Sequence, residues 1–442
     1  MSSAATLDLK NTLLASLMSD ENFRPEEPKS LEETRLSPQL IESLICKLLL
    51  NIGSASGRQI AEKICLPFGI LDALFVSLRT RQILQHTGSA ALNDFVYALT
   101  DQGRTRAQSY MASCTYFGAA PVILEDYITS VEAQSIRNEA PQRDQLEEAF
   151  KGLSVDDDLF DNLGPAVNSG AGLFLYGAPG NGKTTLAKRI TACYGQHIWI
   201  PRTIIEDGQY VKLFDTVYHE VIEEAQSSIL KADSYDHRWV KIRRPTVIVG
   251  GELTMDSLEI RHDVINNIGE ASLQMKSNCG CLLIDDFGRQ RMEPTQLLNR
   301  WIVPLENRVD YQALANGKKI QVPFEQLIIF STNLEPKDLT DDAFLRRIPY
   351  KIEVRDAQLD EFRTLFRIFA KQFNCEYNAA AVDHLVEKHY LPTNRPMRRC
   401  QPRDLLGQVR NYCIYKGLPL EMKPEYFDRV VKSYFTVVAG DE

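Results

Sequence analysis

The sequence predicts an α/β protein in which a sheet of parallel strands lies between helices, with a smaller α+β domain before it and a helical segment after it. Three observations predict this fold. An apolar strand at 173–176 leads through a glycine-rich turn into a helix-forming run. Two further apolar runs, at 281–284 and 327–330, each end in polar residues. Residues 356–437 contain four runs with the apolar spacing of helices.

Length and composition exclude several classes of protein. The 442 residues leave room for about three domains, and 44% hydrophobic with 25% charged residues is typical of globular chains. No apolar run approaches the roughly 20 residues that span a bilayer, so we expect no membrane insertion. The N-terminus has no basic leader and the nine cysteines form no CxxC pair, which indicates a cytoplasmic, reducing location. A net charge of −9 argues against a generally basic coat for nucleic acid.

The N-terminal region divides into a linker and a small domain. Residues 1–35 are expected to form a short helix and a charged, proline-bearing linker. Residues 36–115 contain three helical runs, two strand-like runs around a turn, and a fourth helix. This order resembles a winged-helix domain. Its third helix is mainly apolar, with Arg79 and Arg81 near its end, and residues 31–115 hold eight basic against seven acidic side chains. Protein docking, DNA contact and a structural appendage all remain open.

The strongest functional signal follows a connector at 116–170. The loop GAPGNGKT fits the pattern GxxxxGK[ST], with a strand before it and a helix after it. Glycines let successive backbone N–H groups turn toward phosphate oxygens, and the positive end of the next helix adds to the attraction. Lys183 is expected to reach the β- and γ-phosphates, and Thr184 to ligate Mg²⁺. The residues expected to bind the nucleotide here are Gly177, Ala178, Pro179, Gly180, Asn181, Gly182, Lys183, Thr184 and Thr185.

A site for a magnesium nucleotide also needs a carboxylate at the end of a buried strand. Asp285 and Asp286 follow directly after the apolar run 281–284. Asp285 is expected to hold Mg²⁺ together with Thr184, and Asp286 to orient or deprotonate the attacking water. Together with the phosphate loop, this strand end predicts ATP and Mg²⁺ as cofactors.

A polar strand end and an arginine pair follow the phosphate loop and the acidic strand end along the chain. The strand at 327–330 leads to Asn333, and Arg346 and Arg347 stand just before another strand. With the phosphate loop and the acidic strand, these elements make residues 120–440 resemble the AAA+ family of ring-forming ATPases. The resemblance implies that Asn333 positions the attacking water and that Arg346 or Arg347 reaches the γ-phosphate bound by a neighbouring subunit. It therefore implies a homo-oligomeric ring, with a hexamer as the expected size.

The resemblance also sets domain boundaries. It implies an ATPase core at 171–355, with an insertion at about 201–262, and a helical lid at 356–442. In that family an arginine at the start of the third lid helix touches the nucleotide. Arg403 occupies this position, with Arg398 and Arg399 as alternatives. The chain departs from the family at Asp286, where Glu is usual, and the shorter side chain would slow hydrolysis or shift the water.

Two stretches of the insertion suggest contacts with a substrate. Residues 237–251 surround an aromatic side chain with basic ones, which fits a hairpin that grips single-stranded nucleic acid, DNA included. An acidic peptide, a neighbouring subunit or a half-buried hairpin with a charged face fits the same pattern. The residues are Trp239 with Arg238, Lys241, Arg243 and Arg244. Upstream, Tyr210 and Val211 lie beside a glycine, and AAA+ translocases use an aromatic–apolar pair on a loop to pull polypeptide through the ring.

Three functions follow from these features. The first is an ATP hydrolase that remodels or threads a protein client, with the winged-helix-like domain as docking module. The second is a motor on DNA that uses residues 36–115 and 237–251 as contacts. The third is a slow nucleotide-dependent switch that scaffolds its partners, which Asp286 would suit. The near-neutral N-terminal domain and the acidic net charge favour the protein client.

Overall fold

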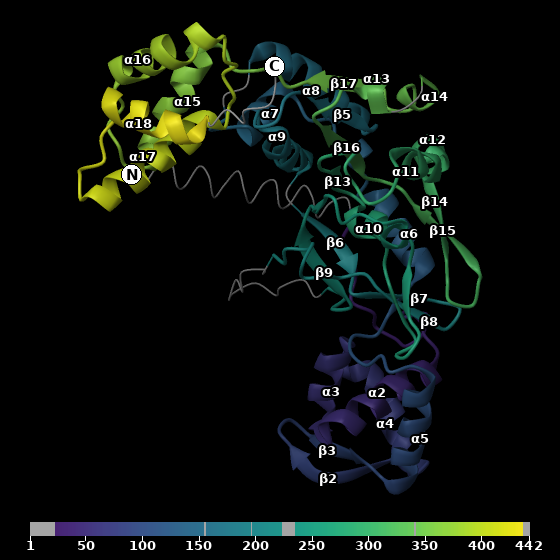
Figure 1. The fold of residues 1–442 in the computed structure, drawn as a ribbon. Helices are drawn as coiled ribbons and strands as arrows, with labels where there is room; N and C mark the ends of the chain where they lie inside the picture. Colours follow the sequence, from purple (N-terminus) through teal and green to yellow (C-terminus); the bar gives the residue numbers. More distant parts are fainter. Residues whose placement is uncertain (1–22, 154–155, 196, 223–234, 340–341, 436–442) are drawn as a thin grey trace. The chain divides into compact units, whose positions relative to one another are not determined.

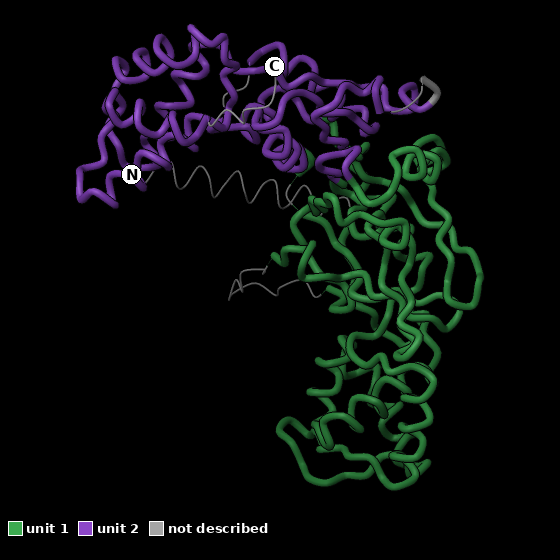
Figure 2. The backbone as a smooth tube through the Cα atoms, viewed as in Figure 1, with its two compact units in different colours: residues 1–140, 194–282, 290–328 green, residues 141–193, 283–289, 329–442 purple. Residues whose placement is uncertain are grey.

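The computed structural model describes residues 23–153, 156–195, 197–222, 235–339 and 342–435. The helix expected within residues 1–22 lies outside them. The chain divides into two compact units, shown in green and purple in Figure 2. Unit 1 contains residues 1–140, 194–282 and 290–328, and unit 2 contains residues 141–193, 283–289 and 329–442.

Helices and strands both occur along most of the chain, and its C-terminal part is helical (Figure 1). The α-helices are α2 (Pro38–Ile52), α3 (Gly57–Ile64), α4 (Phe68–Thr80), α5 (Asp101–Ser113), α6 (Leu124–Ala133), α7 (Arg143–Ala149), α8 (Asp157–Ser169), α9 (Lys183–Ile190), α10 (Leu273–Ser277), α11 (Pro294–Arg300), α12 (Ile302–Asn307), α13 (Pro336–Leu339), α14 (Asp342–Leu345), α15 (Leu359–Gln372), α16 (Ala379–His389), α17 (Gln401–Lys416) and α18 (Pro424–Tyr434). The strands are β1 (Ser54–Ser56), β2 (Leu84–Ala90), β3 (Asp94–Leu99), β4 (Val122–Ile123), β5 (Leu173–Tyr176), β6 (His197–Pro201), β7 (Thr203–Glu206), β8 (Gln209–Lys212), β9 (Trp239–Arg243), β10 (Thr246–Val249), β11 (Arg261–Asp263), β12 (Ile268–Glu270), β13 (Cys281–Ile284), β14 (Val309–Ala313), β15 (Lys319–Pro323), β16 (Leu327–Thr332) and β17 (Tyr350–Glu353).

The first part of unit 1 has the predicted order of three helices, a hairpin and a fourth helix. The Ser37 side chain caps α2, and a capping box between Ser56 and Gln59 starts α3. Strands β2 and β3 form the hairpin, and the sheet order is β1-β3-β2 with antiparallel pairs. Strand β1 was not predicted, because its three residues are too short to show an alternating pattern. The apolar faces of these elements, with Leu44 and Phe75 among them, share one core.

The rest of unit 1 contradicts the substrate-binding hairpin expected at 237–251. Strand β9 pairs antiparallel with β6, and β10 belongs to a different sheet, so the two form no hairpin. Trp239 is 4% exposed. Three of the four basic side chains are also buried, namely Arg238, Lys241 and Arg244, whereas Arg243 is exposed and lies near Glu220. A buried tryptophan and buried cations offer no surface for stacking bases, so the prediction of a DNA grip here is wrong.

The expected substrate-pulling pair is also buried. Tyr210 and Val211 lie in β8, which pairs with β7 and β12 in the sheet of order β11-β12-β8-β7-β4. They are 6% and 3% exposed, and the Tyr210 ring stacks on Tyr116 with centroids 4.7 Å apart. Because these side chains fill the core instead of projecting from a loop, the prediction of a translocating pair is wrong.

A five-stranded sheet positions the predicted phosphate loop and acidic strand end. Its order is β10-β13-β16-β5-β17. Strand β5 runs parallel to β16 and to β17, with Leu173 opposite Ile329 and Tyr350. The carboxyl ends of β5 and β16 therefore lie at the same edge. Such an edge is where open sheets of parallel strands bind their ligands.

The C-terminal part of unit 2 consists of the helices α15 to α18. A capping box between Gln358 and Glu361 starts α15, and Gly417, with φ +63°, ends α17. The apolar faces of the four helices share one core, in which Phe362, Phe366 and Phe427 are fully buried. All nine cysteines are free. Among the described residues, no helix has both the length and the apolarity to cross a membrane.

Candidate functional site

The glycine-rich loop lies between β5 and α9 in unit 2. All three of its glycines have backbone conformations that favour glycine, because Gly177 has φ +134° and Gly180 and Gly182 have φ +86°. A Cβ atom at Gly177 would lie 2.6 Å from the Val354 carbonyl oxygen. The loop ends at Gly182, which is the N-cap residue of α9, and no side chain caps this end of the helix. The first backbone N–H groups of α9 therefore lie at a helix end that favours anions.

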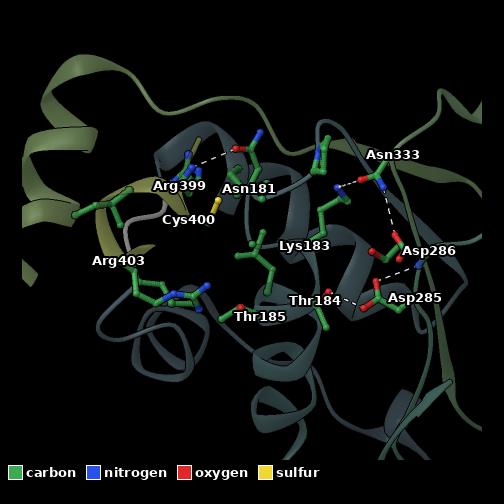
Figure 3. Close-up of a pocket in the computed structure, with 18 of the residues that line it drawn as sticks. Asn181, Lys183, Thr184, Thr185, Asp285, Asp286, Asn333, Arg399, Cys400 and Arg403 are labelled. Carbon is green, nitrogen blue, oxygen red and sulfur yellow. Dashed lines mark hydrogen bonds between the residues drawn. The ribbon is translucent and has the colours of Figure 1, made fainter. Parts of the chain in front are cut away.

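Lys183 is buried at the centre of the site (Figure 3). Its Nζ donates to Gly177 O at 2.8 Å, to Ala178 O at 3.1 Å and to Asn333 Oδ1 at 2.7 Å. Burial lowers the pKa of Lys183, and the nearby carboxylates of Asp285 and Asp286 oppose this shift. The ammonium group thus lies against the loop that is expected to hold phosphates.

The acidic strand end faces the start of α9. Thr184 Oγ1 donates to Asp285 Oδ2 at 2.8 Å, and the Asp286 N–H donates to Asp285 Oδ1 at 3.1 Å. Asp286 has φ +50°, a left-handed conformation that Asp and Asn adopt more readily than other residues with side chains. A threonine hydroxyl and a carboxylate oxygen in contact at the phosphate loop are hard oxygen donors, so these residues fit Mg²⁺.

Asn333 links the lysine to the second carboxylate. Its Oδ1 accepts from Lys183, and its Nδ2 donates to Asp286 Oδ1 at 3.2 Å. Backbone contacts fix the two strand ends beside each other, because the Phe287 N–H donates to Ser331 O at 2.7 Å. The structure therefore brings five sequence-predicted residues into one hydrogen-bonded cluster: Lys183, Thr184, Asp285, Asp286 and Asn333.

These residues line a cavity of about 390 Å³. Part of its lining, the apolar wall, consists of apolar side chains, a feature that sequence reasoning missed. The apolar side chains are Leu153, Leu159, Leu186, Leu365 and Phe369. The spacing of four residues between Leu365 and Phe369 on one helix was the available signal. An apolar wall beside a polar phosphate loop suits a ligand with a flat ring at one end and phosphates at the other.

The predicted arginines differ in their placement. Arg403 lines the cavity, and its guanidinium pairs with Asp404 at 2.9 Å. Arg399 also lines the cavity and pairs with Glu361 at 3.3 Å. Arg398, the other alternative, instead forms an ion pair with Asp356.

Arg346 and Arg347 are not among the residues that line this cavity. Arg346 is exposed and Arg347 is half-buried. The carbonyl of Phe344 accepts the Arg347 N–H at 2.8 Å, which places both residues in the turn after α14. Gly177 and Ala178 also lie outside the lining, and they contribute carbonyl oxygens to Lys183 instead.

Comparisons with known proteins give a match to one family and a weak likeness to two kinds of solved structure. A model described as "Domain of unknown function (DUF8689)" matches residues 358–433, and no curated protein matches the chain. NtrX from Brucella abortus, in a complex with ADP, is 14% identical over 59% of this chain and 51% of its own, with a TM-score of 0.37. The Thermotoga maritima RuvB Holliday junction branch migration motor is 13% identical over 67% of this chain and 73% of its own, with a TM-score of 0.35. The chain spans about half the length of the NtrX structure, and similarity at this level assigns it neither a family nor an activity.

Proposed function

We propose that the chain is an ATP hydrolase of the AAA+ type. The observation that carries the proposal is the cluster in which Lys183 and Thr184 of the phosphate loop contact Asn333 and Asp285 of the two neighbouring strand ends. The loop pattern, the apolar wall and the acidic strand end all belong to one cavity. The loop suits the phosphates, the acidic strand end suits Mg²⁺, and the apolar wall suits the base of a magnesium nucleotide.

The residues divide the work in the following way. Backbone N–H groups of the loop and Lys183 bind the phosphates, and Thr184 and Asp285 hold Mg²⁺, which supplies charge neutralisation on the phosphate oxygens when bound. Asp286 accepts a proton from the attacking water, and Asn333 fixes the position of Asp286 through its 3.2 Å hydrogen bond. Arg403 or Arg399 contacts the nucleotide from the side of α17.

The active form in this proposal is a homo-oligomeric ring, a hexamer in the simplest case, in the cytoplasm. Arg346 supports it, because an exposed arginine outside the cavity of its own chain is available to a neighbouring chain. In other phosphate-loop hydrolases, an arginine supplied from outside contributes about 10³ to 10⁵ in rate.

The work of the ring is the remodelling of a protein client, with residues 36–115 as a winged-helix-like docking domain. Two of its arginines support this choice over DNA. Arg81 and Arg106 both pair with Glu42, whose side chain is 4% exposed, at 2.7 and 2.6 Å. Arginines that neutralise a carboxylate of their own domain are poorly placed to release counterions from DNA phosphates. A DNA motor and a slow switch remain the alternative functions.

One experiment tests the proposal. ATP hydrolysis is measured for the wild type, for Lys183→Ala and for Lys188→Ala, with and without DNA, while the mass in solution is recorded with ATP and Mg²⁺. Lys188 lies exposed on the same helix and is the matched control. Loss of turnover in Lys183→Ala alone supports the hydrolase, whereas equal turnover in all three proteins overturns it. Strong stimulation by DNA would replace the protein client with DNA, and a monomer without turnover would favour the switch.

A further inference from the structure

The phosphate loop is joined to the segments that flank α15 and α17, and one side chain makes most of these contacts. Asn181, in the middle of the loop, is 1% exposed. Its Nδ2 donates to Asp356 Oδ1 at 2.7 Å and to Val354 O at 3.3 Å. Its Oδ1 accepts the backbone N–H of Arg399 at 3.3 Å (Figure 3). The amide therefore bonds the chain before α15 on one side and the chain before α17 on the other.

The neighbouring loop residue approaches α17 equally closely. The Gly180 carbonyl accepts the Cys400 N–H at 2.9 Å. A Cβ atom at Gly180 would lie 2.6 Å from Cys400 Sγ. Two consecutive backbone N–H groups, those of Arg399 and Cys400, thus point at two consecutive residues of the phosphate loop.

Asp356 extends this connection to the helices themselves. It accepts from Arg398 as well as from Asn181, so one carboxylate joins the loop to both flanking segments. The Arg399 guanidinium pairs with Glu361 in the first turn of α15. A shift of the loop consequently moves partners of both α15 and α17, and a shift of these helices moves the loop.

We propose that Asn181 is a positioning residue that couples nucleotide binding at the phosphate loop to the placement of the helices α15 to α18. The inference rests on the proposed function and assigns a role to a side chain within that site. Its amide is already bonded on three sides, so phosphate binding falls to the backbone N–H groups and Lys183. The coupling is reciprocal: what holds the helices in place strengthens nucleotide binding, and bound nucleotide holds the helices in place.

The test compares three single variants of the full chain. Asn181→Ala removes all three contacts of the amide. Asp356→Ala removes one of these contacts, together with the ion pair to Arg398, at a partly exposed residue where the risk to folding is smaller. Asn378→Ala is the matched control, because Asn378 caps α16 and bonds Met422 O in the same helical core without touching the loop. The measurements are the dissociation constant for ATP with Mg²⁺ and hydrogen exchange at residues 397–404 with and without that nucleotide.

The wild type is expected to bind ATP and to gain protection at residues 397–404. Asn181→Ala and Asp356→Ala should each weaken binding by about 5- to 150-fold and lose that gain in protection, while Asn378→Ala retains both. The double variant should lose less than the sum of the two single losses, because both single variants remove the hydrogen bond between Asn181 and Asp356.

Opposite results have distinct meanings. If both single variants keep the ATP affinity and the protection of the wild type, the coupling is overturned while the ATP site stands. Fully additive losses in the double variant would also overturn the coupling. Absence of ATP binding by the wild type would overturn the proposed function, and the coupling to nucleotide with it.

Discussion

The amide oxygen of Asn333 accepts a hydrogen bond from Lys183 Nζ at 2.7 Å, so a side chain at the end of β16 touches the cation at the start of α9. The same amide donates to Asp286 Oδ1 at 3.2 Å. One side chain therefore holds both a group that binds phosphate and a group that accepts a proton in the proposed reaction. The position of Asn333 therefore links phosphate binding to proton transfer in the proposed reaction.

Replacing Asn333 should affect turnover more than binding. In Asn333→Ala, Lys183 keeps its two carbonyl partners, whereas Asp286 loses the amide that orients it. We expect kcat to fall about a hundredfold, the usual result of small misplacement of a reacting group, with a smaller change in KM. Steady-state ATPase kinetics measure both. Asn162→Ala, in the exposed part of α8, is the control, and a larger change in KM than in kcat would contradict this role.

The left-handed backbone of Asp286 makes asparagine the informative replacement. Asn tolerates φ +50° as Asp does, so Asp286→Asn removes the charge without straining the turn. We expect turnover to fall about 10²- to 10⁴-fold while ATP binding persists. Equilibrium binding and single-turnover hydrolysis separate these effects. Asp338→Asn, at an exposed site of the same unit, should change neither; retained turnover in Asp286→Asn would remove Asp286 from the proton-accepting role.

Local signals made much of this site predictable. The phosphate loop, its flanking strand and helix, and the two carboxylates after β13 are each encoded within fewer than 20 consecutive residues. The structure brings them together because their strands belong to one sheet. The apolar wall was missed, since Leu159 and Leu365 come from segments far apart in the chain that look like ordinary helix cores.

Strand pairing was not predictable from neighbouring residues. The runs that became β9 and β10 were expected to pair as a hairpin because of their basic, aromatic and β-branched side chains, yet the two residues between them are Arg244 and Pro245. Neither favours the φ > 0 turns of two-residue hairpins. Arg244 instead donates to Gln134 O and Cys279 O at 3.0 and 2.8 Å. These carbonyl groups come from distant parts of the chain and take the place of water as hydrogen-bond partners of the buried guanidinium.

One of the two arginines in the turn after α14 should act across subunits. Arg346→Ala or Arg347→Ala is expected to leave ATP binding largely intact, and one of the two should lose turnover, about 10³-fold or more. Mixing that variant with Lys183→Ala should restore activity, because some interfaces then combine an intact loop with an intact arginine. ATPase activity is measured against mixing ratio.

Arg355→Ala provides the control for this experiment, since Arg355 is a 69% exposed arginine that pairs with Glu353 in the same unit. It should retain turnover without mixing. Failure to recover activity at every ratio, in samples where mixed rings are demonstrated, would contradict a shared site.

Glu42 organises the cations of the N-terminal domain. Its buried carboxylate accepts from Arg81, Arg106 and the Tyr110 hydroxyl. Glu42→Gln should lower the free energy of unfolding by about 1.5–3 kcal/mol, because hydrogen bonds between charged groups are lost. It should also leave two arginines unpaired and raise salt-sensitive DNA binding above that of the wild type. Thermal unfolding and a salt titration of DNA binding measure these effects; Glu62→Gln, an exposed neighbour, should show neither.

Asp428 should make the helices α15 to α18 sensitive to acid. Burial opposes its ionisation, but hydrogen bonds from Lys388, His389 and His384 outweigh this and hold the pKa of Asp428 well below its ordinary value. A carboxyl whose pKa is lower in the folded state stabilises the fold above its unfolded pKa of about 3.9, and this contribution is lost as the pH falls toward the folded value.

The variant Asp428→Asn tests this dependence. At pH 7 it should have a lower Tm than the wild type and faster hydrogen exchange in α16 and α18, the helices that the carboxylate joins. The difference in Tm should shrink steadily below about pH 4, because the wild-type carboxyl then begins to take up its proton. Asp360→Asn, on the exposed side of α15, should show no such pattern. A Tm difference for Asp428→Asn that stays constant from pH 7 to pH 3 would mean that packing, not charge, accounts for the effect.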